Sequence, residues 1–138
     1  MKKILLVDDH APTRLMFSKI LAQQGANYEF LEASNGQEAC ETAHEAKPDL
    51  ILMDALMPVM DGYEALARLK DDPETKAIRV LMLTGLDLPF QQKLAYELGA
   101  FGYVVKPIRL DEMTQTVKLA LDYRRKSCRK NRMASPAR

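Results

Sequence analysis

Five polar side chains attract attention because each closely follows a short apolar run. They are Asp8, Asp9, Asp54, Thr84 and Lys106. A buried ionised carboxylate is costly unless a cation or strong donors meet it. Clustered carboxylates also repel one another, so a set of them indicates a divalent ion with oxygen ligands, such as Mg²⁺. With a hydroxyl and a lysine nearby, the set predicts a site for a phosphoryl group.

These side chains can meet only if the apolar runs are strands of one parallel sheet. The runs have the length of strands buried on both faces, and amphipathic stretches lie between them. We expect strands near 4–7, 28–33, 50–53, 80–83 and 103–105, and helices near 12–24, 35–46, 62–71, 89–98 and 110–122. This alternation predicts an α/β fold of (βα)₅ type with right-handed crossovers. The carboxyl ends of its strands gather at one edge, where such sheets place their sites.

A helix cap is the simplest alternative for any single acid. It suits Asp9 or His10 before the first helix and Asp61 before the third. It does not account for the set as a whole, because capping requires no convergence of carboxylates from separate strands.

Charge divides the chain of 138 residues into two parts. Residues 1–122 carry a net charge of −6, and residues 123–138 carry +7 without any acid. We therefore expect one domain over 1–122 and a basic tail or linker over 123–138. No apolar run approaches the roughly 18 residues of a membrane span. Without a signal peptide, and with reduced thiols at Cys40 and Cys128, a cytoplasmic protein is expected.

Five motifs occur in a recognisable order and spacing. They are LLVDD (5–9), GQEA (36–39), PDLILMDALMPVMDG (48–62), LMLTG (81–85) and LGAFGYVVKP (98–107). Over residues 2–122 the sequence resembles the receiver domain of two-component response regulators, including the chemotaxis regulators. The resemblance implies a flavodoxin-like parallel sheet of strand order 2-1-3-4-5, with the more polar strand 28–33 at one edge.

The resemblance also implies roles for the acids, which the residues alone leave open. Asp54 is the implied phosphoacceptor. Asp9 is the implied direct ligand of Mg²⁺, or of Mn²⁺ in its place, while Asp8 acts largely through a bound water. The backbone carbonyl of Leu56 completes the metal ligands from the chain. The family is a signalling switch that catalyses only its own phosphorylation and dephosphorylation.

Thr84 and Lys106 are the implied contacts of the phosphoryl group, and the Lys106–Pro107 peptide is implied to be cis. Thr84 and Tyr103 resemble the family's switch pair: the Thr84 loop closes, and Tyr103 turns inward from solvent. The alternative for Tyr103 is an ordinary surface aromatic side chain on a strand.

The implied phosphodonor is a histidine kinase or a histidine phosphotransfer protein. Its docking region corresponds to Pro12, Leu15, Met16 and Pro107, although Leu15 could instead be core. Phosphorylation could lead to homodimerisation or act on a downstream output domain or protein. We expect no membrane contact, and no nucleic-acid binding by the receiver itself.

Several rival interpretations remain. An aspartate-nucleophile phosphohydrolase would need a general acid where Leu56 stands, which disfavours it. A docking receiver that works without phosphorylation is disfavoured by the intact acids, threonine and lysine. The basic tail could bind nucleic acid in a salt-sensitive way, but a solvated linker is favoured. Cys40 and His44 have a spacing that metal sites use, but core packing suits Cys40 better.

Overall fold

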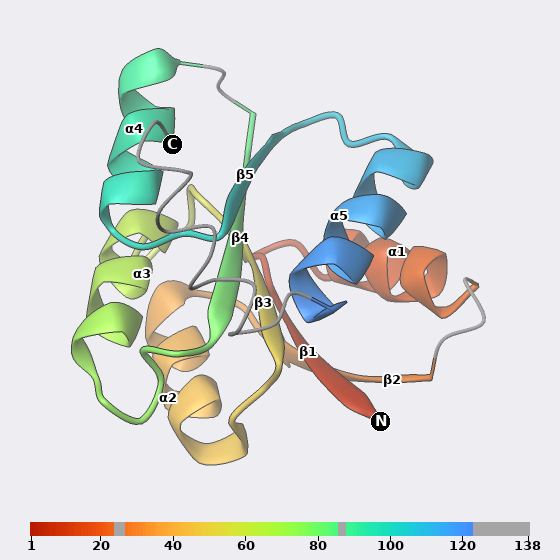
Figure 1. Cartoon of the computed structure of the whole chain (residues 1–138), viewed down its shortest axis with the longest axis horizontal. Coiled ribbons are helices and arrows are strands. Elements are labelled where there is room, and N and C mark those ends of the chain that lie inside the picture. The colour runs from red at the N-terminus through yellow and green to blue at the C-terminus, as the bar shows by residue number, and fades with distance from the viewer. Residues whose placement is uncertain (24–26, 86–87, 123–138) are drawn as a thin grey trace.

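The computed structural model describes residues 1–23, 27–85 and 88–122, so the predicted basic tail lies outside the described residues. Its strands form one parallel sheet of order β2-β1-β3-β4-β5, as predicted (Figure 1). The strands are β1 (Lys2–Val7), β2 (Tyr28–Ala33), β3 (Leu50–Asp54), β4 (Arg79–Thr84) and β5 (Gly102–Val105). β1 begins two residues earlier than expected because Lys2 and Lys3 pair with Tyr28 and Glu29 of β2.

Helices cover both faces of this sheet. They are α1 (Ala11–Ala22), α2 (Gly36–Ala46), α3 (Gly62–Asp71), α4 (Pro89–Glu97) and α5 (Leu110–Asp122). α2, α3 and α4 lie on one face, and α1 and α5 lie on the other (Figure 1). In the described part of the chain, no helix combines the length and the apolar character that crossing a membrane requires.

Local sequence explains where several helices begin. Pro12 and Pro89 lie in the first turns of α1 and α4, where a missing backbone N–H costs nothing. The Asp61 side chain caps α3 by accepting a hydrogen bond from the Glu64 N–H. The expected cap of α1 is only partly right, because the N-cap is His10 and its side chain makes no capping hydrogen bond.

The sheet separates two apolar clusters. Leu5, Ile51 and Met53 point toward the α2–α3–α4 side, and Ile4 and Leu52 point toward the α1–α5 side. Successive residues of a strand face opposite sides, so a strand buried on both faces must be apolar throughout. This burial fixes the register of β1 against β3, and with it the level at which their carboxyl ends stop.

Candidate functional site

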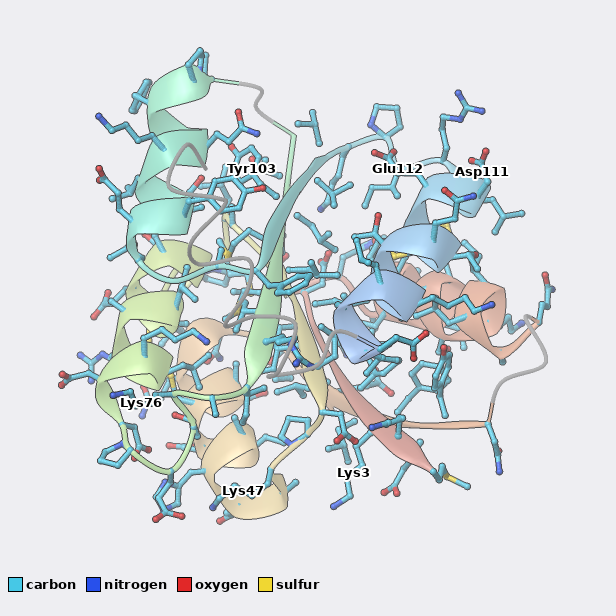
Figure 2. All side chains as sticks on the ribbon, in the orientation of Figure 1. Lys3, Lys47, Lys76, Tyr103, Asp111 and Glu112 are labelled. Carbon is cyan, nitrogen blue, oxygen red and sulfur yellow. The ribbon has the colours of Figure 1, made fainter. Side chains whose placement is uncertain are left out.

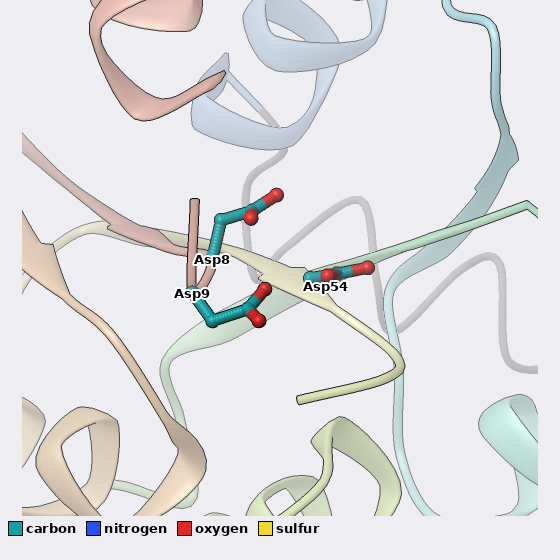
Figure 3. Close-up of side chains that lie close together, drawn as sticks. All are labelled: Asp8, Asp9 and Asp54. Atoms are coloured by element: carbon teal, nitrogen blue, oxygen red, sulfur yellow. The ribbon is translucent and has the colours of Figure 1, made fainter. Parts of the chain in front are cut away.

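Three carboxylates converge at the carboxyl edge of the sheet. Asp54 is the last residue of β3, and Asp8 and Asp9 directly follow β1. Val7 pairs with Met53, so the two strands end side by side. One carboxylate oxygen from each acid lies within 4.8 Å of the others, and Figure 3 shows the three side chains projecting from the two strand ends.

Two of these acids are buried, and a lysine lies against both. Asp8 is 4% exposed and Asp54 is 8% exposed, whereas Asp9 is open to solvent. Lys106 Nζ lies 3.2 Å from Asp54 Oδ1 and 3.6 Å from Asp8 Oδ2. The backbone N–H of His10 donates to Asp8 Oδ1 at 2.9 Å. One ammonium group therefore faces two buried carboxylates.

The Asp54 carboxylate is unfavourably placed without a further cation. Burial raises its pKa above the ordinary value, and the charge of Asp8 adds to the rise. Lys106 and a hydrogen bond from the Leu56 backbone N–H oppose this rise, but the pKa remains raised. A group of hard oxygen donors with surplus negative charge suits Mg²⁺ well, so the residues present fit the expected ion.

The predicted switch residues lie on the two adjoining strands. Thr84 ends β4 with 1% of its surface exposed, and its carbonyl accepts a hydrogen bond from the Lys106 N–H at 2.6 Å. The Lys106–Pro107 peptide is cis, as the resemblance implied. Tyr103 lies on the α4 side of β5 (Figure 2). Its ring is half-buried against the core cluster and is thus not a fully exposed aromatic side chain.

The Tyr63 hydroxyl is a neighbour of Tyr103 that sequence reasoning missed. This oxygen is buried, and both rings pack against the cluster beneath α2, α3 and α4. Burial raises the pKa of Tyr63, and interaction with Tyr103 raises it further. A tyrosine at the start of a helix gives no signal of this contact.

The predicted docking residues are all at the surface. Leu15 is 55% exposed and Met16 is 49% exposed, so the core alternative for Leu15 is wrong. Pro12 and Pro107 are also exposed. The structure thus leaves this apolar region accessible.

Cys40 and His44, whose spacing metal sites use, have other partners. His44 Nδ1 lies 2.9 Å from Asp72 Oδ2, and the Cys40 thiol is half-buried, with Sγ 3.7 Å from the Ala65 carbonyl oxygen. Burial raises the pKa of Cys40 and so disfavours the thiolate that binds zinc. Core packing of Cys40 is the interpretation that the contacts support.

Known proteins resemble this chain over most of its length. A family model described as the response regulator receiver domain matches residues 4–118. The PhoB phosphate regulon transcriptional regulatory protein of Pseudomonas aeruginosa is 40% identical over 120 residues, covering 87% of this chain and 52% of that protein. A probable cyclic di-GMP phosphodiesterase of Vibrio cholerae is 37% identical over 122 residues, which cover 88% of this chain and 27% of that protein. The chain therefore spans about a quarter to a half of these curated relatives.

Solved structures show the same fold. The chemotaxis protein CheY4 of Vibrio cholerae superimposes with a TM-score of 0.80 at 35% identity, covering 88% of this chain and 99% of that chain. A putative response regulator from Chloroflexus aurantiacus gives a TM-score of 0.81 at 32% identity, with 88% and 98% coverage.

Proposed function

Because this chain belongs to the response regulator receiver family of two-component systems, we propose that Asp54 is the residue through which it is switched by phosphorylation. The observation that carries this assignment is the position of the Asp54 carboxylate. It ends the central strand β3, lies 3.2 Å from the Lys106 ammonium, and shares a small space with Asp8 and Asp9. None of the other acids in this cluster ends a strand.

Asp8, Asp9 and Asp54 would hold the metal ion, with the Leu56 backbone carbonyl as a further ligand. A bound Mg²⁺ supplies positive charge to the phosphoryl oxygens and to the carboxylates around it. The fit rests on the surplus negative charge of the cluster, which Lys106 alone offsets only in part.

Phosphoryl transfer then requires little covalent chemistry from the chain. An ionised Asp54 oxygen forms a bond to phosphorus while the bond from phosphorus to the donor breaks, so no general base is needed. Lys106 stabilises negative charge on the transferred group. The raised pKa of Asp54 means that the metal-free site favours ionisation less than an ordinary aspartate does.

Thr84 and Tyr103 would convert the modification into a change of surface. The Thr84 hydroxyl bonds a phosphoryl oxygen, which draws the end of β4 toward Asp54. Tyr103 then moves further inward from its half-buried position against the core cluster. The Lys106 N–H already donates a hydrogen bond to the Thr84 carbonyl. Movement at the end of β4 should therefore also shift the backbone after β5.

A histidine kinase or histidine phosphotransfer protein would donate the phosphoryl group, docking in the cytoplasm at Pro12, Leu15, Met16 and Pro107. The downstream activity that the phosphorylated receiver controls differs between relatives. The Pseudomonas relative is named a transcriptional regulator and the Vibrio relative a probable phosphodiesterase, yet both share the matched region. We therefore propose that the matched region supplies the switch and leaves the kind of output open.

Intact-protein mass spectrometry tests the phosphoacceptor. With acetyl phosphate and Mg²⁺, the chain should gain one phosphoryl group that is labile, as acyl phosphates are. Asp54→Asn should abolish the gain, whereas Asp61→Asn should keep it, because Asp61 is an exposed cap where asparagine serves equally. Equal labelling of both variants would show that Asp54 is not the acceptor.

Charge at the docking region tests the donor. Met16→Glu should slow transfer from a phosphohistidine donor several-fold while leaving labelling by acetyl phosphate intact. Leu94→Glu is the matched control, since Leu94 is 40% exposed on α4, which covers the opposite face of the sheet. Equal slowing by both variants would place the donor elsewhere.

A further inference from the structure

One arginine joins the loop that carries Asp8 and Asp9 to the neighbouring edge strand. Arg14 lies on α1, and only 15% of its side chain is exposed. Its Nε donates to Glu32 Oε1 of β2 at 2.7 Å, and its Nη1 donates to the backbone carbonyl of Asp8. A single guanidinium group therefore connects the end of β1, the first helix and the edge strand.

Within the loop of Asp8 and Asp9, Arg14 contacts a backbone carbonyl and not a carboxylate. The Asp8 carbonyl belongs to the peptide that joins Asp8 to Asp9, so holding this oxygen fixes the direction in which both side chains leave the chain. Two other hydrogen bonds hold Asp8 itself: its backbone N–H donates to the Ala33 carbonyl at 3.1 Å, and its Oδ1 accepts from the His10 N–H. Both fix Asp8, and neither involves the peptide oxygen that precedes Asp9.

Charge alone gives Arg14 no favourable role toward a divalent cation. A positive group near the site would repel such an ion, although the Glu32 carboxylate offsets much of that charge. What the guanidinium offers is geometry, since its rigid fork donates in two directions at once, which the single ammonium group of lysine does not reproduce. Metal ligands, in turn, need tight placement by the groups behind them.

We propose that Arg14 is a positioning residue of the metal site, which holds the Asp8–Asp9 peptide against Glu32 so that both carboxylates face the ion. This inference rests on the proposed metal site at Asp8, Asp9 and Asp54. It assigns a function to a residue that would otherwise be only one half of a partly buried ion pair.

Two substitutions separate positioning from charge. Arg14→Lys keeps the charge but loses the two-way hold, and Arg14→Gln loses both. Positioning predicts that each variant weakens Mg²⁺ binding by about tenfold, as loss of groups behind metal ligands typically does. A purely electrostatic role predicts unchanged binding for the lysine variant and tighter binding for the glutamine variant. The two interpretations thus differ in sign.

The full chain should be titrated with Mg²⁺ by calorimetry, and melting of the metal-free protein should be followed in parallel. Arg68 supplies the matched control, since it pairs with Glu64 at 3.1 Å on α3 and both side chains are exposed. Arg68→Lys and Arg68→Gln should bind Mg²⁺ as the unaltered chain does. If Arg14→Gln does not fold, Arg14→Lys decides the matter, because its charge is unchanged.

The role of Arg14 and the proposed Mg²⁺ and phosphoryl site can fail separately, and the measurements tell the two failures apart. If the unaltered chain binds no Mg²⁺ and takes up no phosphoryl group, the proposed site itself is wrong. If it does both, but the Arg14 variants bind Mg²⁺ as tightly as the unaltered chain, Arg14 has only a structural role. A lower melting temperature with unchanged Mg²⁺ affinity would likewise overturn the positioning role.

Discussion

At the amino edge of the sheet, Lys3 makes ordinary surface contacts, whereas Lys106 at the carboxyl edge lies against buried acids. The Lys3 ammonium donates to the Ala46 carbonyl at 3.0 Å, and its backbone N–H donates to the exposed Asp49 carboxylate at 2.8 Å. Figure 2 shows Lys3 at the end of the molecule where the strands begin. Lys106, by contrast, faces Asp8 and Asp54, which are 4% and 8% exposed.

The two edges therefore differ in how their charges are arranged. At the amino edge, the charged groups of Lys3 and Asp49 have hydrogen-bond partners or are exposed to solvent. At the carboxyl edge, burial disfavours the charge of the Asp54 carboxylate, and this edge also contains a valine at positive φ, Val59. Such local cost is typical of functional sites, where the surrounding core maintains an arrangement that the site alone would not adopt.

The largest expected effect comes from filling the space behind Asp54. A Cβ added at Gly62 would lie 2.4 Å from the Asp54 carbonyl oxygen and 2.9 Å from Ala55 Cα, both of which are backbone atoms. Gly62→Ala should therefore destabilise the fold by about 3 kcal/mol, measured by urea unfolding, and abolish labelling of Asp54.

Gly85→Ala is the matched control at the same edge. A Cβ there would meet nothing within 4 Å. Its stability should change by no more than about 0.5 kcal/mol, and labelling should persist. If the two glycine variants behaved alike, α3 would not be packed tightly against the end of β3.

Removing each lysine compares the edges directly. Lys106→Met leaves the buried carboxylates of Asp8 and Asp54 without their ammonium partner, so stability at neutral pH should fall by about 2 kcal/mol. Lys3→Met removes a surface contact and should cost about 0.5 kcal/mol or less. The Asp54 pKa should also rise in Lys106→Met, measured by NMR titration, because Lys106 lowers it. Equal losses of stability would mean that the two edges do not differ in this way.

Asp54→Asn should stabilise the metal-free protein. Burial raises the Asp54 pKa in the folded state, so the folded chain binds a proton more readily than the unfolded chain does. Protonated Asp54 therefore contributes stability at low pH. The unaltered chain loses this contribution as the pH rises from about 3.8, the ordinary pKa of aspartate, through the raised pKa of the folded state. The variant should gain about 1 kcal/mol at pH 7, and the gain should vanish near pH 3.

Unfolding with chelator present, at both pH values, measures this gain. Asp49→Asn at the amino edge is the control, because Asp49 is exposed and asparagine can still accept the Lys3 N–H. A gain at Asp49 as large as that at Asp54, or a gain at Asp54 that persists at low pH, would contradict the electrostatic account.

The sequence predicted the convergence of Asp8, Asp9 and Asp54, because each acid follows an apolar run that had to be a buried parallel strand. It could not predict which side chains support them. The contact between Arg14 and Glu32 joins a helix to an edge strand, and it depends on two side-chain rotamers. The order of the strands likewise came from the family resemblance, since apolar periodicity fixes strand positions but not their neighbours.

An effect of similar or smaller size is expected at two residues with positive φ, one near each edge. Lys47 ends α2 with φ 50° and ψ 61°, and its N–H bonds the Ala43 carbonyl, an ordinary left-handed helix end. Val59 has φ 71°, and the Met60 N–H bonds the Pro58 carbonyl at 2.7 Å, which makes a γ-turn of the rare, strained kind. A β-branched side chain fits this conformation poorly.

Val59→Gly should therefore stabilise the protein by about 1 kcal/mol, because relief of strain exceeds the greater chain entropy of glycine in the unfolded state. Its side chain is 77% exposed, so little packing is lost. Lys47→Gly should gain only about half as much, since lysine tolerates the left-handed region better than valine does. It also loses a surface ion pair with Glu74. Urea unfolding at neutral pH compares the two variants. If Val59→Gly is neutral or destabilising, the γ-turn holds no strain, and the cost at the carboxyl edge is confined to its charges.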